Sequence, residues 1–221
     1  MKIFKSILLF SITSITLIAC GLENQKNKKA EFPILGRKQY VEKIVDGKTV
    51  TDTVDHTIPD FKLVNQDSNW VTPETFEGKV YVADFFFTSC PTICPTMKKE
   101  MLRVYEAYKD NDEVGIISHT IDPEYDTVAL LKDFAQKLDV EAPKWNFVTG
   151  EKEAIYELGQ KGYMVTAMED ENEEGGYLHS GAFVLVDKER KIRGVYDGTK
   201  SLEVDKLIKD IELLLATYDK N

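Results

Sequence analysis

An apolar run at residues 79–87 limits the possible folds of this chain more than any other segment, because it leads almost directly into a Cys-x-x-x-Cys-Pro sequence at residues 90–95. A run of Val, Ala and Phe with few polar residues is typical of a strand that is buried on both faces. Behind the cysteines, apolar side chains recur at helical spacing over residues 96–109. The sequence therefore predicts a strand, a turn that carries two cysteines, and a helix.

The rest of the chain repeats this alternation of strand and helix. Strands are predicted at residues 114–118, 147–149, 182–186 and 192–196, and helices at residues 127–138, 152–160 and 202–216. Strands that alternate with helices favour a three-layer α/β domain with a largely parallel central sheet. An Asp-Gly pair between the alternating segments 38–45 and 48–55 predicts a separate β-hairpin ahead of that domain, because Asp-Gly is a strong signal for a hairpin turn.

The N-terminus is predicted to be an export signal. Two lysines precede an apolar stretch that is too short to span a bilayer. The sequence Leu-Ile-Ala-Cys at residues 17–20 resembles the lipobox of bacterial lipoproteins, in which the cysteine is lipidated; an ordinary cleavage site that ends in Cys is the alternative. We therefore expect an exported lipoprotein that is anchored to the membrane through Cys20 and faces the cell envelope on its periplasmic side.

These signals divide the chain into four predicted parts. They are a lipoprotein signal peptide at 1–19, a lipidated flexible tether at 20–31, a β-hairpin extension at 32–57 and the α/β domain at 58–221. An apolar fraction of 43% is enough for a hydrophobic core, so the chain as a whole is not disordered. With 38 acidic against 28 basic residues, the chain lacks the concentrated positive charge that binds phosphate backbones, so nucleic acid is not an expected partner.

Once Cys20 is lipidated, two thiols remain, on Cys90 and Cys94. Side chains four residues apart face the same way on a helical turn, so the two sulfurs can approach each other. The positive end of the helix dipole favours thiolate, which is both a nucleophile and a ligand for soft metals. A structural disulfide is the alternative, but a bridge that closes so short a loop restricts the unfolded chain little. Redox chemistry and metal binding are thus equally open at this point.

A metal site would need a third donor, and the histidines are the candidates. They are His56, His119 and His179. His179 follows two glycines and is followed closely by a third, so we expect it on a mobile loop. By itself, a loop histidine is more often a solvated bystander than a ligand, and His56 and His119 carry the same default interpretation.

Four segments in order resemble the successive motifs of the Sco/SenC family, and the resemblance extends over about residues 58–215. The segments read FTSCPTICP at 87–95, IDPEYDT at 121–127, WNFVTG at 145–150 and LHSGAFVLVD at 178–187. The resemblance implies a thioredoxin-like fold with a mixed central sheet and a membrane tether. It also implies copper bound by two cysteines and a distant histidine, and a role in assembling the CuA centre of cytochrome c oxidase.

Carried over by position, the copper ligands implied by the resemblance are Cys90, Cys94 and His179. The implied partners are a copper donor, the CuA-bearing subunit of the oxidase and a thiol reductant. Two thiolates and one imidazole suit Cu(I) and can also hold Cu(II), whereas zinc prefers a fourth ligand. Many family members have His before the first Cys and an acidic residue within the motif, where this chain has Ser89 and Thr92. Neither is one of the three ligands, so copper binding remains predicted.

Other residues in these motifs have structural interpretations. Asp122 and Asp126 match an Asp-Pro-x-x-Asp motif of the family, and we interpret them as turn formers and as the N-cap of the next helix. The helically spaced Met97 and Met101 are interpreted as core residues.

Two functions remain open at the dithiol. The first is copper delivery to, or preparation of, the CuA site. The alternative is a thiol-disulfide oxidoreductase that acts on target cysteines without stable copper binding, with either Cys90 or Cys94 as the attacking thiol. A third interpretation, peroxide scavenging through a sulfenic acid on Cys90, has the least support.

Overall fold

The computed structural model describes residues 32–170 and 177–219, which belong to one unit that begins at Phe32. The predicted signal peptide, the predicted lipidation site Cys20 and the predicted tether lie outside the described residues. None of the helices in the described residues is both long enough and apolar enough to cross a membrane.

A seven-stranded mixed sheet forms the centre of the domain, in the order β11-β10-β5-β6-β7-β3-β4. The strands are β3 (Leu63–Asn65), β4 (Trp70–Val71), β5 (Val80–Phe86), β6 (Val114–Thr120), β7 (Trp145–Thr149), β10 (Ala182–Val186) and β11 (Ile192–Asp197). Only β5, β6 and β7 pair in parallel. The predicted mixed sheet is confirmed, but it is less parallel than the alternation of elements suggested. Short turns make β3–β4 and β10–β11 antiparallel, and β3 and β10 also pair antiparallel with β7 and β5.

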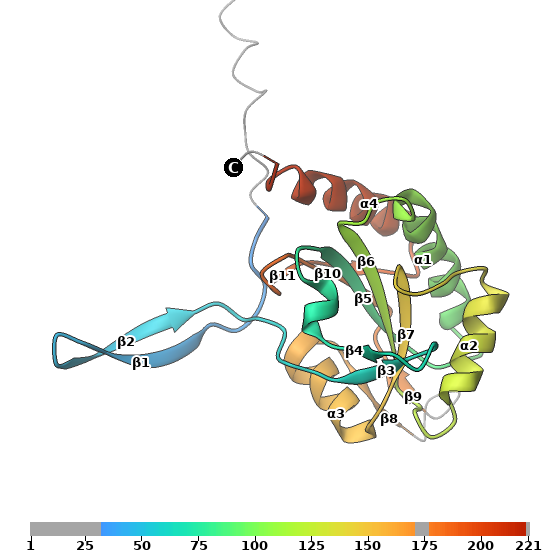
Figure 1. Ribbon diagram of the computed structural model, residues 1–221, viewed down its shortest axis with the longest axis horizontal. Helices are drawn as coiled ribbons and strands as arrows, with labels where there is room; N and C mark the ends of the chain where they lie inside the picture. Colours follow the sequence, from blue (N-terminus) through green and yellow to red (C-terminus); the bar gives the residue numbers. More distant parts are fainter. Residues whose placement is uncertain (1–31, 171–176, 220–221) are drawn as a thin grey trace, which may run out of the picture. The chain divides into compact units, whose positions relative to one another are not determined.

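Helices cover both faces of the sheet and complete the three predicted layers. They are α1 (Cys94–Tyr108), α2 (Val128–Lys137), α3 (Lys152–Glu157) and α4 (Ser201–Leu215), with a π-helix, η2 (Leu158–Tyr163), after α3 and a short 3-10 helix, η1 (Pro73–Phe76). Figure 1 shows α1, α2 and α4 on one side of the sheet and α3 on the other. Neighbouring residues of β5 point to these opposite sides: the Phe86 ring stacks with Phe134 of α2, whereas the Phe85 ring meets Tyr163 of η2.

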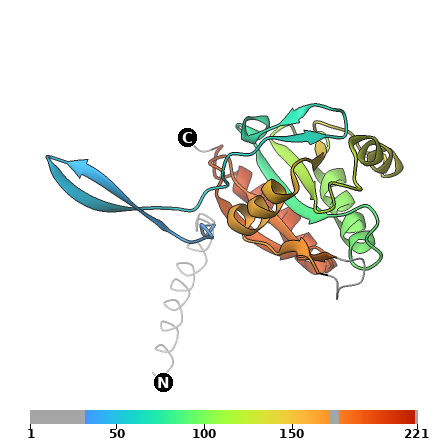
Figure 2. The same cartoon turned by 90° about the horizontal axis from the view of Figure 1, so that it is seen from below.

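The predicted hairpin is present as strands β1 (Gln39–Val45) and β2 (Lys48–Val54), which pair only with each other (Figure 2). Asp46 and Gly47 form its turn with φ angles of 53° and 74°. Two successive residues with positive φ are characteristic of a type I′ turn, whose twist matches that of the strands.

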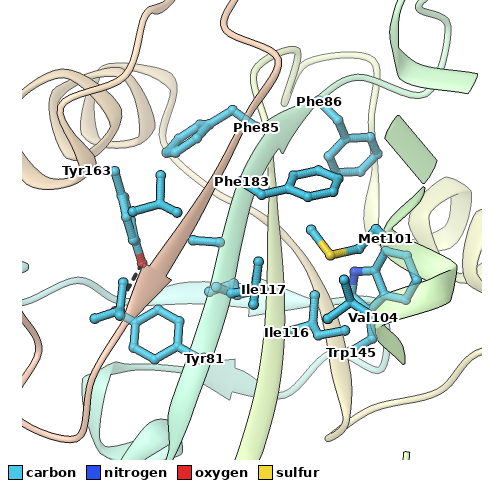
Figure 3. Packing of buried hydrophobic residues seen from close by; sticks show 14 of the residues in the cluster. Tyr81, Phe85, Phe86, Met101, Val104, Ile116, Ile117, Trp145, Tyr163 and Phe183 are labelled. Carbon is cyan, nitrogen blue, oxygen red and sulfur yellow. Dashed lines mark hydrogen bonds between the residues drawn. The ribbon is translucent and has the colours of Figure 1, made fainter. Parts of the chain in front are cut away.

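The core lies between the sheet and its helices (Figure 3). Its largest fully buried side chains include Phe85, Phe86, Phe183 and Trp145. The interpretation of Met97 and Met101 as core residues is confirmed, since both are fully buried.

The prediction that His179 lies on a mobile loop is wrong for its backbone. His179 is the last residue of a short strand, β9 (Tyr177–His179), which pairs with β8 (Ala167–Glu169), and His179 itself pairs with Ala167. Three residues on each strand are too few to produce a recognisable alternation in the sequence. Most of the acidic segment that precedes β9 lies outside the described residues.

Candidate functional site

The two motif cysteines lie where β5 gives way to α1. The backbone N–H of Cys90 donates to the carbonyl of Phe87 at 3.3 Å, which closes a tight turn after the strand. α1 begins at Cys94, and Pro95 occupies its first turn, where the missing N–H costs no helical hydrogen bond. Cys90 and Cys94 are buried, with 7% and 5% of their surface exposed. The fold therefore shields two sulfurs from solvent where β5 leads into α1.

The surroundings of Cys90 favour its thiolate. Burial raises the pKa of the Cys90 thiol, but hydrogen bonds with Cys94 and Thr92 lower it by more, so the pKa lies below its ordinary value. The Thr92 hydroxyl is 3.6 Å from the Cys90 Sγ atom. Thr92 is the position where many members of the resembled family carry an acidic residue, and here a neutral hydroxyl supports the thiolate instead.

The surroundings of Cys94 favour its protonated thiol. Burial raises the pKa of Cys94 well above its ordinary value, and the positive charge of Lys98 offsets only part of that rise. The two thiols therefore differ in pKa. Cys90 loses its proton at a lower pH than Cys94, and Cys94 stays protonated unless a bound metal ion displaces its proton.

The third predicted ligand, His179, is located by its backbone alone, since its side chain lies outside the described part of the structure. Residues on both sides of His179 contact residues 87–94, the segment that carries the two cysteines, which we call the thiol loop. The Tyr177 ring packs on Phe87 with ring centres 5.0 Å apart. A Cβ atom on Gly181 would stand 3.7 Å from Cδ1 of Ile93, the residue before Cys94. The stretch that contains His179 thus runs along the thiol loop.

The other two histidines do not join the cysteines. Among the described side chains, no three His, Cys, Asp or Glu residues are grouped so that they could hold a metal. His119 is fully buried in β6 with its ring stacked on Phe85, and the Nε2 atom of the buried His56 lies 2.6 Å from the Gly162 carbonyl. Their default interpretation as solvated residues is wrong, because both are packed inside the fold.

Asp126 holds the thiol loop to the neighbouring part of the sheet, a role that the sequence interpretation missed. Its buried carboxylate accepts hydrogen bonds from the Thr88 N–H at 3.1 Å, from the Thr88 hydroxyl and from the Thr120 hydroxyl. Burial raises the pKa of Asp126, although the hydrogen bonds from the two threonines oppose that rise. The N-cap of α2 is Thr127 rather than either aspartate. The predicted turn is present, since the Asp126 N–H donates to the Asp122 carbonyl.

A buried ion pair also lies behind the thiol loop. The Lys98 Nζ atom is 2.7 Å from Asp84 Oδ2, and both side chains are removed from solvent. One signal in the sequence points to this pair. Asp84 is the acidic residue within the apolar run of β5, and a charge buried in a strand needs a partner.

A family model and several solved structures are similar to this chain. A family model described as SCO1/SenC matches residues 49–216. A SCO1/SenC family lipoprotein from Bacillus anthracis has a solved structure with a TM-score of 0.66 and 30% identity, covering 72% of this chain and 95% of that one. BsSco, described as a member of the Sco family of cytochrome c oxidase assembly proteins with a disulfide switch, has a TM-score of 0.64 and 33% identity, covering 72% and 93%.

A copper-bound relative is also similar. ScoI of Bradyrhizobium japonicum, whose structure contains copper, has a TM-score of 0.60 and 25% identity, covering 72% of this chain and 99% of that one. These likenesses confirm the thioredoxin-like α/β fold that the four sequence motifs implied.

Proposed function

The chain belongs to the SCO1/SenC family, and we propose on that basis that it binds copper through Cys90, Cys94 and His179 and delivers it to the CuA-bearing subunit of cytochrome c oxidase. The observation that carries the proposal is the pair of buried cysteines where β5 leads into α1, close to the strand that ends at His179. The contacts of Tyr177 with Phe87 and of Gly181 with Ile93 support the same arrangement.

The chemistry of the donor set fits copper. Two thiolates and one imidazole form a soft, three-coordinate set, which suits Cu(I) better than zinc. Copper binding removes the proton from Cys94, so the metal is held as a complex of two thiolates. The copper-bound ScoI of Bradyrhizobium japonicum supports copper as the metal.

Delivery requires that the ligands release the metal. A histidine on a short two-stranded ribbon, separate from the turn and the helix that carry the cysteines, can leave the metal while both thiolates still hold it. A ligand from the target then takes the vacated position, and copper passes across by exchange of one ligand at a time. The membrane location proposed through lipidation at Cys20 would keep the protein beside a membrane-bound target, and the lipoprotein relative from Bacillus anthracis supports it.

The test is an anaerobic Cu(I) titration of the full-length chain in detergent against a competing chelator, with Cys20→Ser so that two thiols remain. We expect one tightly bound equivalent, which Cys90→Ser, Cys94→Ser and His179→Ala each weaken by about tenfold or more. Exposed methionines are the other soft donors near β8, so Met168→Leu is the matched control and leaves the affinity unchanged. Binding that is indifferent to His179 would contradict the three-ligand site.

A second function is favoured by the inequality of the two thiols. In thiol-disulfide exchange, the Cys90 thiolate attacks one sulfur of a target disulfide and releases the first target thiolate. The Cys94 thiol then gives up its proton and attacks the Cys90 sulfur, which forms the Cys90–Cys94 disulfide and releases the second target thiol. The target gains two electrons, and an external dithiol must restore the protein. The opposite pKa directions of Cys90 and Cys94 match these attacking and resolving roles.

The two functions predict different behaviour of two variants. A reductase that works without copper keeps its rate in His179→Ala and accumulates a mixed disulfide with its target in Cys94→Ser. A copper carrier binds its metal more weakly in both variants. Reduction of a disulfide peptide that has the sequence of a CuA loop, followed by mass spectrometry of the trapped species, separates these outcomes.

A further inference from the structure

The functions above do not use the buried ion pair between Lys98 and Asp84. A contribution to the stability of the fold does not explain why a charged pair occupies this position in the core. The side chains of Lys98 and Asp84 are 5% and 0% exposed. Removing two charges from water is costly, and apolar residues of similar size often stabilise a core equally well. Polar neighbours are built around the pair: Ser118 donates to Asp84 and accepts from Lys98 at 3.3 Å and from Trp145 Nε1 at 2.9 Å. The ammonium is therefore fixed in one position.

That position is next to the second cysteine. Lys98 follows Cys94 by one turn of α1, so the two side chains share the face of the helix that packs on the sheet. The Lys98 Nζ atom lies 4.1 Å from the ring centre of Phe86, at the end of β5 where the thiol loop begins. Burial raises the pKa of the Cys94 thiol, and the charge of Lys98 opposes part of that rise. Asp84 holds the ammonium from the strand.

The net charge of the copper-loaded site explains the role of the Lys98 ammonium. Two thiolates and a neutral imidazole around Cu(I) carry a net charge of −1, whereas the same ligands around Cu(II) are neutral. In a buried region, where charges are poorly screened, a fixed cation stabilises the anionic complex and has much less effect on the neutral one.

We propose that Lys98 is a positioning residue of the copper site: its ammonium, held by Asp84 and Ser118, compensates the negative charge of the bis-thiolate Cu(I) complex. The proposal rests on the copper-binding function above and extends it, because it assigns the preference for Cu(I) over Cu(II) to a residue that is not a ligand.

The test replaces Lys98 by an uncharged side chain of similar length, Lys98→Met, in the full-length Cys20→Ser chain. Lys99→Met is the matched control, because it makes the same change in net charge at the next position of the same helix, where the side chain is exposed. Affinities for Cu(I) and for Cu(II) are measured separately by chelator competition, at 0.1 M and at 0.5 M salt.

We expect Lys98→Met to lower the Cu(I) affinity by roughly tenfold and the Cu(II) affinity by clearly less, with the same result at both salt concentrations. Lys99→Met should change both affinities by less than about twofold, because an exposed charge is screened. An unchanged Cu(I) affinity in Lys98→Met would overturn the proposal. So would an equal loss of Cu(I) and Cu(II), since damage to the fold does not depend on the charge of the metal.

Lys98→Met leaves the Asp84 carboxylate buried without its cation, and the variant can fail to fold for that reason. Asp84→Asn/Lys98→Met removes both charges and keeps the size of both side chains. The proposal then predicts a smaller loss of the same kind, with Cu(I) affected more than Cu(II). A double variant with the wild-type preference for Cu(I) would refute it.

A wild-type chain that binds no copper would remove the proposed function, and the effect of Lys98 is then decided by equilibration with glutathione. In that reaction the dithiol of Cys90 and Cys94 gives two electrons and two protons to glutathione disulfide, which forms two glutathione thiols and the intramolecular disulfide. A fixed cation one turn of α1 away from Cys94 stabilises negative charge on the reduced pair, whereas the disulfide carries no charge. Lys98→Met should shift the equilibrium roughly tenfold toward the disulfide, and Lys99→Met should not. An unshifted equilibrium in Lys98→Met would overturn the effect of Lys98 on the dithiol.

Discussion

The buried imidazole of His119 makes the stability of the fold depend on pH. His119 is fully buried in β6, its ring stacks on Phe85 with centres 4.6 Å apart, and its Nδ1 atom lies 3.2 Å from the Asp84 carbonyl. Its Nε2 atom has no hydrogen-bond partner among the described residues. Burial therefore lowers the pKa of His119 from 6.5 to about 4, because the charged ring has no water to solvate it.

The sign and size of the effect follow from this lowered pKa. The unfolded chain takes up the proton near pH 6.5 and the folded chain only near pH 4. The contribution of His119 to stability is thus complete above pH 6.5 and is lost as the pH falls toward 4. Each pKa unit corresponds to about 1.4 kcal/mol, so the full effect is about 3 kcal/mol, of which about 2 kcal/mol is lost between pH 7 and pH 5.

Urea unfolding at several pH values between 5 and 7 measures this loss, with the fluorescence of the buried Trp145 as the signal. His119→Phe keeps an aromatic ring beside Phe85 and removes the titrating group. In the difference in unfolding free energy between the wild type and His119→Phe, the contributions of the titratable groups that both chains contain cancel. We expect the wild type to lose about 2 kcal/mol relative to the variant between pH 7 and pH 5. A difference that stays flat over this range, or that moves in the opposite direction, would refute the reasoning.

Substitutions at three further positions test the thiol loop and its neighbours. Thr92→Val removes the hydroxyl beside Cys90, so the pKa of Cys90 rises and the alkylation rate with iodoacetamide reaches its half-maximum at a higher pH; an unchanged profile would contradict the assigned hydrogen bond. Asp126→Ala leaves one buried and two partly buried donors without their acceptor and should lower the free energy of unfolding in urea by about 3 kcal/mol. Gly181→Val places methyl groups against Ile93 and should weaken Cu(I) binding in the chelator titration, whereas Gly181→Ala should have a smaller effect, since its Cβ alone comes no closer than 3.3 Å to a neighbour.

Much of the fold could be predicted because its signals are local. The apolar run that became β5, the helical spacing behind the cysteines and the Asp-Gly turn of the hairpin each occupy a few consecutive residues. The parts that could not be predicted are short or paired at long range. The three-residue strands β8 and β9 carry too little pattern to be recognised, and the antiparallel edges of the sheet depend on strand order.

The candidate site divides in the same way. Spacing alone predicted Cys90 and Cys94 together on a helical turn, whereas α1 begins only at Cys94 and Cys90 lies in the turn before it. The order of four motifs pointed to His179. The difference between the two thiols did not follow from spacing, because it depends on how deeply each sulfur is buried and on which groups bond to it.

The amino-acid sequence was sufficient for the strand, turn and helix around the dithiol, for the hairpin and for the family, since periodicity and motif order are properties of the chain itself. The tertiary structure alone decided that Lys98 meets Asp84 in the core, that His119 is neutral and that Asp126 holds the thiol loop. These groups and their partners lie on different elements of the chain. Their energies depend on burial and on the partner that folding brings to each one, and neither can be read from the order of the residues.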